Sequence, residues 1–404
     1  MDALTTPSNW QKVRLGDIAE IIGGGTPSTQ ITSFWNGSIN WFTPTEIGIT
    51  KYVYKSQRTI TPLGLKKSSA KLLPIGTILL TSRASIGDCA ILKVVATTNQ
   101  GFQSLIPLEK INNEFLYYLI LTLKNKLLEL ASGSTFLEVS PNKIKKLLIP
   151  LPPLNEQIAI ANILSALDHY LYSLDALILK KESVKKALRI KMLNQILASN
   201  GVEFRELGDI ILSLKTGLNP RSFFKLNTPN ANNYYVTIRE LEDYTIKFTH
   251  QTDRIDDNAL SLCLKRSNLE KDDILFSGTG TIGKVSIIEK NPNNWAIKEG
   301  IYSIKPNKKI VFPRFLMFCL ESSNIQNDIK NKSFGGIVKS IPMNDLQQIQ
   351  IPLPPLNEQI AIANILSDLD NEITSLKNKK RQFENIKKAL NHDLMSAKIR
   401  VLKK

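Results

Sequence analysis

Two segments of this 404-residue chain contain residues that enzymes use to bind nucleotides or to methylate DNA. Residues 278–284, Gly-Thr-Gly-Thr-Ile-Gly-Lys, fit the first seven positions of the phosphate-binding pattern GxxxxGK, but Val285 stands where that pattern needs a Ser or Thr for Mg²⁺. Residues 276–280, Phe-Ser-Gly-Thr-Gly, imitate the FxGxG loop that binds a methyl donor. Residues 81–87, at the corresponding place in the first half of the chain, have only one glycine, so we interpret both segments as turns between strands.

The other residues that catalysis would need are missing from the sequence. An adenine methyltransferase holds its extruded base at an NPPF- or DPPY-like turn, whereas residues 151–154 read Leu-Pro-Pro-Leu, without the polar acceptor. No HExxH or GxSxG motif occurs. We interpret the acidic pairs at 256–257 and 272–273 as turn and cap residues. The sequence therefore predicts a protein without catalysis of its own.

Cysteine and histidine are too sparse for a disulfide framework or a metal cluster. The three cysteines, Cys89, Cys263 and Cys319, are far apart in the sequence and form no CxxC pair, and only three histidines are present. We expect no metal and no cofactor in this chain. No run of about 18 apolar residues and no leader-like start occurs, so we expect a cytoplasmic protein.

The charge balance indicates an acidic partner. Lys and Arg number 52 and Asp and Glu 36, which gives a net charge of +16. Nucleic acid is the partner that this balance favours, although a solvated basic surface would give the same count. Arg83 and Gln100 are the leading candidates for base contact, because Arg pairs with guanine and Gln with adenine in the major groove.

Further candidates combine a cation with a predicted turn. In the first half they are predicted phosphate contacts, Arg58, Lys66 and Lys67. In the second half the candidates for DNA contact are Arg221, Arg239, Lys265, Arg266, Lys284 and Lys298. For each of them a solvated cation or a structural ion pair is the alternative. We expect Trp35, Trp41 and Trp295 to pack in the interior rather than to stack on bases.

An internal repeat predicts the arrangement of elements that must position these residues. The segment IPLPPLNEQIAIANILSALD begins at Ile149 and returns at Ile351 with one difference in twenty positions, Ala166 against Asp368. Weaker echoes are Leu-Gly-Asp-Ile at 15–18 and 207–210, Ile-Leu at 78–79 and 274–275, and Phe-Leu at 115–116 and 315–316. The chain is therefore a duplication of one variable domain followed by one shared linker.

Each variable domain reads as short strands followed by a helix, predicted at 113–130 in the first copy and at 313–329 in the second. After each Pro-Pro pair the pattern changes to a long helix with apolar residues at alternating three- and four-residue steps, such as Ile160, Leu164 and Leu171. Lys380 and Lys387 interrupt this seam in the second copy. A helix from about residue 155 to 200 would span about 65 Å. The fold class that we predict is α+β, with two tandem domains joined by two antiparallel helices in a coiled-coil bar of approximate two-fold symmetry. Two separate helical hairpins are the alternative.

The doubled LPPLNEQ segment that opens each long helix, and the Leu-Gly-Asp-Ile segment near the start of each variable domain, resemble the specificity subunits of type I restriction-modification systems. Residues 25–28, 81–87 and 99–101 also resemble the target-recognition domains of that family, whereas residues 277–283 and 298–300 depart from its pattern. The resemblance implies target-recognition domains at 1–152 and 201–354, and linker helices at 153–200 and 355–404.

The resemblance also implies a function. Each variable domain would read one half of a bipartite, asymmetric site in double-stranded DNA, and the helices would set the spacing and dock two methyltransferase subunits, with restriction subunits in the full complex. S-adenosylmethionine, ATP and Mg would be used by those partners. At the helix starts, the predicted docking residues are Leu154, Glu156, Gln157, Leu356, Glu358 and Gln359. For the glutamates and glutamines among them, helix capping is the competing role. A self-sufficient DNA-modifying enzyme and a coiled-coil adaptor without a DNA role are the alternative functions.

Overall fold

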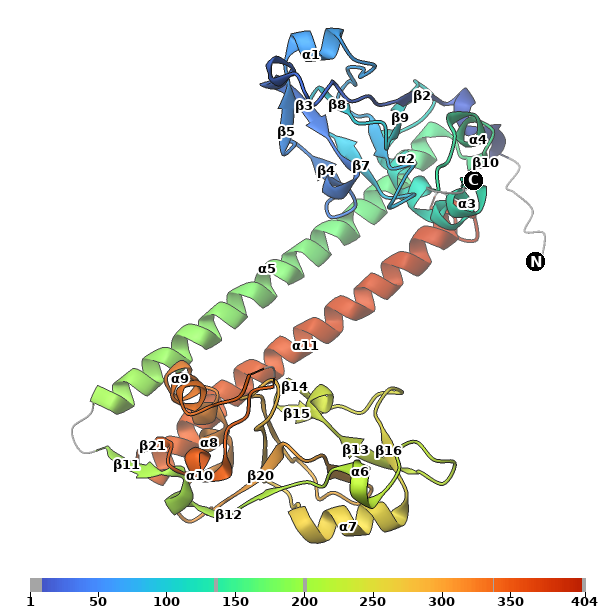
Figure 1. The fold of residues 1–404 in the computed structure, drawn as a ribbon. Coiled ribbons are helices and arrows are strands. Elements are labelled where there is room, and N and C mark those ends of the chain that lie inside the picture. Colours follow the sequence, from blue (N-terminus) through green and yellow to red (C-terminus); the bar gives the residue numbers. More distant parts are fainter. Residues whose placement is uncertain (1–8, 134–136, 199–201, 337, 402–404) are drawn as a thin grey trace. The chain divides into compact units, whose positions relative to one another are not determined.

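The computed structural model describes residues 9–133, 137–198, 202–336 and 338–401, with the backbone alone described for residues 193–198 and 221–222. The chain forms two compact units. Unit 1 contains Met1–Ala176 and Lys377–Lys404, and unit 2 contains Leu177–Leu376. Both long helices are therefore divided between the two units (Figure 1).

Unit 1 has a main sheet in the order β2-β9-β6-β7-β4 and a smaller sheet in the order β5-β3-β8. Its strands are short and rich in β-branched residues, as the alternation of apolar runs and turn residues predicts. A separate antiparallel pair joins β1 to β10. The strands are β1 (Gln11–Arg14), β2 (Ala19–Gly23), β3 (Trp35–Phe42), β4 (Tyr52–Val53), β5 (Arg58–Ile60), β6 (Ile78–Leu80), β7 (Cys89–Leu92), β8 (Ala96–Thr98), β9 (Gln103–Pro107) and β10 (Leu148–Leu151).

Unit 2 repeats most of this topology, but its main sheet lacks a counterpart of β4. Its main sheet has the order β12-β20-β17-β18, its smaller sheet β16-β13-β19, and β11 pairs with β21 as β1 does with β10. The hairpin β14–β15 is an additional two-stranded sheet. The strands are β11 (Glu203–Glu206), β12 (Ile211–Thr216), β13 (Asn233–Val236), β14 (Leu241–Glu242), β15 (Thr245–Ile246), β16 (Arg254–Ile255), β17 (Ile274–Ser277), β18 (Val285–Ile287), β19 (Trp295–Ile297), β20 (Ile301–Pro306) and β21 (Gln350–Leu353).

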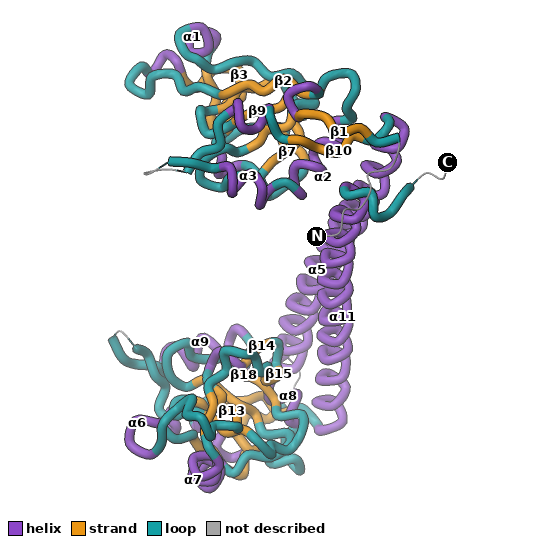
Figure 2. The backbone as a smooth tube through the Cα atoms, turned by 90° about the vertical axis from the view of Figure 1, so that its right-hand side faces the viewer, coloured by secondary structure: helices purple, strands orange, loops and turns teal. Residues whose placement is uncertain are grey.

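Both units also contain short helices beside their strands (Figure 2). Each Leu-Gly-Asp segment forms a 3₁₀ helix whose leucine amide bonds to the chain just before the last strand, Leu15 to the Leu147 carbonyl and Leu207 to that of Ile349. The α-helices are α1 (Pro62–Lys66), α2 (Asn113–Thr122), α3 (Lys124–Leu130) and α4 (Pro141–Lys145) in unit 1, and α6 (Pro220–Phe223), α7 (Asp257–Ser267), α8 (Pro313–Leu320), α9 (Ser323–Asn331) and α10 (Met343–Gln347) in unit 2.

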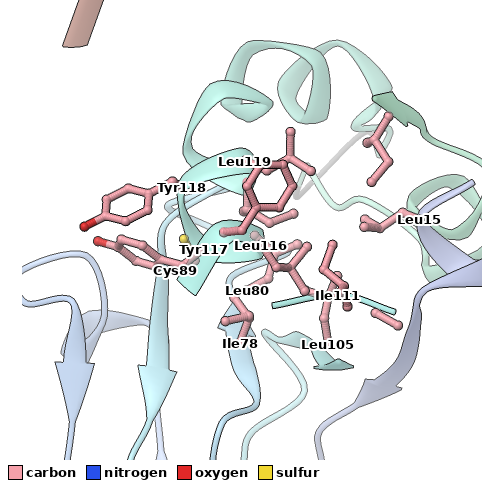
Figure 3. Packing of buried hydrophobic residues seen from close by; sticks show 14 of the residues in the cluster. Leu15, Ile78, Leu80, Cys89, Leu105, Ile111, Leu116, Tyr117, Tyr118 and Leu119 are labelled. Atoms are coloured by element: carbon pink, nitrogen blue, oxygen red, sulfur yellow. The ribbon is translucent and has the colours of Figure 1, made fainter. Parts of the chain in front are cut away.

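The core of unit 1 lies between its main sheet and α2. Leu116 and Tyr117 of α2 lie beside side chains of β6 and β7, such as Leu80 and Cys89 (Figure 3). The corresponding core of unit 2 places α8, with Phe315 and Leu316, against β18. We predicted one helix at 113–130 and one at 313–329. Each is instead two helices, because the first is interrupted at Leu123 and the second at residues 321–322.

The long helices are α5 (Leu154–Ala198) and α11 (Leu356–Met395). In unit 1, Asp168 of α5 pairs with Lys387 of α11, and Asp175 pairs with Lys380 at 2.6 Å. In unit 2, Lys181 pairs with Glu372 at 2.7 Å and Lys185 with Asp370 at 2.5 Å. Residues later in α5 pair with residues earlier in α11, so the helices are antiparallel within each unit. Lys380 and Lys387, which interrupt the seam, are ion-paired across it. The predicted α+β class with paired long helices is confirmed.

Candidate nucleic-acid interface

Four loop segments converge beside the main sheet of unit 1. The Ser82 amide donates to the Gly101 carbonyl at 2.8 Å, and the Val139 amide donates to the Ser82 carbonyl at 3.1 Å. The Gly25 amide donates to the Thr98 carbonyl at 2.8 Å. Residues 24–26, 82–87, 99–101 and 132–139, without the undescribed residues 134–136, are therefore held together by backbone hydrogen bonds. We call these segments the loop cluster of unit 1.

Arg83 lies in the turn between β6 and β7, as predicted. The turn is tight, because the Gly87 amide returns to the Thr81 carbonyl at 3.0 Å and Gly87 has a φ of 91°, which favours glycine. The side chain of Arg83 remains 43% exposed, and its Nη2 atom contacts Oε2 of Glu138 at 2.7 Å. The leading candidate for base contact is thus on the surface but ion-paired.

Gln100 is exposed in the turn between β8 and β9, and its Oε1 atom accepts a hydrogen bond from the Thr26 hydroxyl. The Asn99 side chain shapes this turn by accepting from the Gly101 amide at 2.9 Å. Because Gly101 also bonds to Ser82, the structure brings Gln100 and Arg83 onto adjacent turns. The two side chains that we predicted to read bases in the first half belong to one surface.

Residues 278–283, 298–300 and 334–341, without the undescribed residue 337, form the loop cluster of unit 2, which repeats two of these backbone bonds. The Gly278 amide donates to the Gly300 carbonyl at 2.8 Å, and the Ile341 amide donates to that of Gly278 at 2.9 Å. Here Thr279 makes the backbone bridge to Ser340 that Arg83 makes to Glu138. The two clusters therefore share a backbone and differ in side chains.

The phosphate-binding pattern at 278–284 lies in this cluster. It connects the antiparallel strands β17 and β18, and no helix follows it directly. A phosphate-binding loop needs a helix N-terminus after the strand. The interpretation of residues 81–87 and 277–283 as turns between strands is confirmed.

The predicted phosphate contacts of unit 1 lie on the smaller sheet and the helix that follows it. Arg58 is exposed on β5, and its guanidinium carbon lies 3.8 Å from the ring centre of Trp35. Trp35 and Trp41 are buried, as expected, and pack edge to face. Lys66 and Lys67 are exposed at the C-terminal end of α1. Among the described residues, none of these three cations makes an ion pair, so their charges are free for a polyanion.

The candidates of unit 2 are more scattered. Arg239 pairs with Asp253 at 2.7 Å, and the ammonium of Lys284 reaches the Ile238 and Leu241 carbonyls at 3.4 and 3.3 Å. Lys298 is exposed within the loop cluster. Lys265 and Arg266 are exposed in the last turn of α7, and the side chain of Arg221 lies outside the described part of the structure.

Two further residues have no signal in the sequence. Glu138 meets Arg83 across 55 residues of chain, so only the fold brings them together. Arg254 is exposed on β16 and its guanidinium lies 4.6 Å from the Tyr234 ring centre. Asp256 and Asp273 have the roles that we predicted, since Asp256 caps α7 and Asp273 accepts the Glu270 amide in a turn.

Gln157 and Gln359, both predicted for docking, are buried and bonded within the chain. Gln157 accepts the Asn112 amide at 2.8 Å and donates to the Lys110 and Pro152 carbonyls. Gln359 makes the same three bonds, to Phe312, Ile310 and Pro354. These side chains attach each long helix to its variable domain, and their burial argues against direct contact with a partner.

The other helix-start residues divide between interior and surface. Glu156 is buried. It accepts a hydrogen bond from the Trp10 indole at 3.1 Å and forms an ion pair with Arg400 at 2.7 Å. Glu358, its counterpart, is exposed. Leu154 and Leu356 are exposed, together with Ile158 and Ile360 one turn later. The docking prediction therefore stays with the exposed residues.

The described residues contain no group of three or more His, Cys, Asp or Glu side chains that could hold a metal ion. Among the same residues, the structure has no helix long and apolar enough to cross a membrane.

Comparison with known proteins assigns the family. Residues 7–181 and 199–385 match the type I restriction modification DNA specificity domain, which covers most of the chain. The chain belongs to this family. It is the specificity subunit of a type I restriction-modification system, a subunit without catalysis of its own.

Relatives match over the whole chain or over one half. The putative type I restriction enzyme MjaX specificity subunit of Methanocaldococcus jannaschii is 29% identical over 98% of this chain and 95% of its own length. The MjaIX specificity subunit of the same organism is 43% identical, over 40% of this chain and 38% of its own length. A solved type I S subunit from M. genitalium has the same fold, with a TM-score of 0.59 at 19% identity over 98% of both chains.

Proposed function

We propose that each unit of this specificity subunit reads one half of a bipartite, asymmetric site in double-stranded DNA. The observation that carries the proposal is the pair of loop clusters, which share their backbone hydrogen bonds but present different side chains. One frame with two sets of side chains suits two different half-sites. The proposed readers are residues 1–152 and 201–354.

The proposal includes two methyltransferase subunits as partners. The helix starts present the same exposed apolar residues twice, Leu154 and Ile158 in one copy and Leu356 and Ile360 in the other. Two copies of one surface fit two copies of one partner. In this arrangement residues 153–200 and 355–404 dock those subunits and set the spacing between half-sites. Restriction subunits complete the assembly, the partners use S-adenosylmethionine, ATP and Mg, and the complex works on cytoplasmic DNA.

A domain exchange tests the proposal. Residues 201–350 are replaced by the corresponding segment of a relative, and the DNA methylation of host cells is sequenced with the original and the exchanged gene. We expect one half-site to change while the other stays the same. A change in both half-sites would show that the units read DNA jointly.

A second measurement separates the proposal from a self-sufficient enzyme. The purified chain is incubated with DNA and S-adenosylmethionine, with and without the methyltransferase subunit of a type I system. We expect methyl transfer only in the presence of the partner, and methylation by the chain alone would refute the scaffold role.

A further inference from the structure

The ion pair between Arg83 and Glu138 lies at the centre of the loop cluster of unit 1. Nη2 of Arg83 lies 2.7 Å from Oε2 of Glu138. The side chain of Arg83 is 43% exposed and that of Glu138 31%, so the pair faces solvent. The backbone beside Arg83 also bonds directly to the residue that follows Glu138, through the Val139 amide and the Ser82 carbonyl. The position of the carboxylate relative to the arginine is therefore set by the backbone.

Glu138 is also anchored to Ser132. Glu138 and Ser132 exchange two backbone hydrogen bonds, at 3.0 and 3.1 Å. The ammonium of Lys143 donates to the Leu130 carbonyl at 2.9 Å and to the Ser132 hydroxyl at 3.1 Å. The backbone of Glu138 is thus bonded to Ser132 as well, and the ion pair is more than an encounter between two loose surface side chains.

A paired arginine suits a base better than a phosphate. The carboxylate cancels the charge of the guanidinium, and the release of counterions that drives phosphate binding depends on that charge. The guanidinium has five N–H donors in a rigid plane, so the edge that does not face Glu138 keeps donors in a fixed direction. Two such donors match O6 and N7 of guanine in the major groove.

We propose that Glu138 is a positioning residue that makes Arg83 a reader of guanine rather than a phosphate contact. This inference rests on the function proposed above. Unit 2 has Thr279 and Ser340 at the same places, neither of them charged. We therefore expect an arginine positioned by a glutamate to read guanine in the half-site of unit 1.

The test uses the full chain and duplex DNA recovered by binding-site selection with the wild-type protein. Each G·C pair of the site is replaced by A·T in turn, and binding is measured over a range of salt. For Arg83→Ala we expect discrimination at one guanine to fall by about 5- to 150-fold, with little change in the salt slope. For Glu138→Gln we expect weaker discrimination at that same guanine. We also expect a salt slope steeper by about one, because the Arg83 guanidinium, without its carboxylate partner, can bind a phosphate.

Two comparisons make these outcomes specific. In the Arg83→Ala background, Glu138→Gln should have no further effect on discrimination, because Glu138 acts through Arg83. Asp88→Asn is the matched control, since Asp88 pairs with Lys124 at 2.6 Å in the same unit and should leave discrimination at that guanine unchanged. Thermal unfolding of each variant checks that it folds.

The inference is overturned if Glu138→Gln behaves like Asp88→Asn at that guanine. It is also overturned if Arg83→Ala weakens binding to all sequences equally and flattens the salt slope, since that is the behaviour of a phosphate contact. A wild-type chain without salt-dependent, sequence-selective binding would instead contradict the proposed function.

Discussion

Asp273 is a carboxylate that unit 2 buries at the turn before β17. It accepts hydrogen bonds from the Glu270 amide at 2.9 Å and the Ser303 hydroxyl at 3.4 Å, and the ammonium of Lys305 lies 3.9 Å away. Burial outweighs these contacts and raises the pKa of Asp273 to about 6. The sequence predicted the turn, and the burial of the carboxylate follows from the sheet that covers it.

This raised pKa predicts a pH-dependent stability. The folded state holds the Asp273 proton more tightly than the unfolded chain, whose aspartate pKa is about 4, so the stabilisation is complete below about pH 4 and is lost as the pH rises through 6. The free energy of unfolding of Asp273→Asn, measured against that of the wild type, should therefore be about 1–3 kcal/mol more favourable at pH 7.5 than at pH 4. Urea unfolding at the two pH values measures this change, and an equal difference at both would contradict it.

At the scale of elements, the contacts between the long helices differ in burial. Lys185 and Asp370 of unit 2 are 12% and 22% exposed, and Lys185 also donates to the Tyr244 hydroxyl at 2.8 Å. Lys181 and Glu372, about one helical turn away, are 27% and 49% exposed. In unit 1, the places equivalent to Glu372 and Lys181 hold Tyr170 and Phe383, whose ring centres are 4.7 Å apart. A heptad pattern predicts that such positions meet, whereas their burial depends on the domain beside them.

This difference predicts unequal costs of removing the two lysines. Lys185→Ala leaves the Asp370 carboxylate partly buried without its partner, so we expect a loss of about 2–4 kcal/mol in the free energy of unfolding. Lys181→Ala should cost less than about 1 kcal/mol, because its pair is closer to solvent. Urea unfolding compares both with Lys186→Ala, an exposed neighbour.

The pH dependence of the Lys185→Ala variant gives a further check. Burial raises the pKa of Asp370, so an unpaired Asp370 can take up a proton as the pH falls and thereby lose its charge. The cost of Lys185→Ala should therefore shrink toward acid. Equal costs for Lys181→Ala and Lys185→Ala at neutral pH would show that burial does not govern these pairs.

At the scale of the whole molecule, the two units share two continuous helices, α5 and α11. If these helices hold the readers apart, their length sets the number of unread base pairs between the half-sites. Seven residues inserted between Asp175 and Lys181 of α5, and seven between Glu372 and Lys380 of α11, preserve the heptad seam and add about 10 Å. That is close to three base pairs at about 3.4 Å each.

The expected result is a longer selected spacer with unchanged half-sites. Three base pairs also rotate the duplex by about 100°, so a smaller increase or weaker binding agrees with the same idea. Insertion into α5 alone shifts one apolar stripe against the other and should destabilise the protein. Binding-site selection measures the spacer, and an unaltered spacer with matched insertions would show that partner subunits position the readers.

The sequence by itself determined the duplication, the α+β class, the antiparallel long helices and the two turns that carry Arg83 and Thr279. These features depend on repeats, periodicity and turn residues, which are local properties of the chain. The tertiary structure alone decided that Glu138 holds Arg83 and that Gln157 and Gln359 face inward. Ion pairing and burial depend on segments that are distant in the sequence, so no local pattern encodes them.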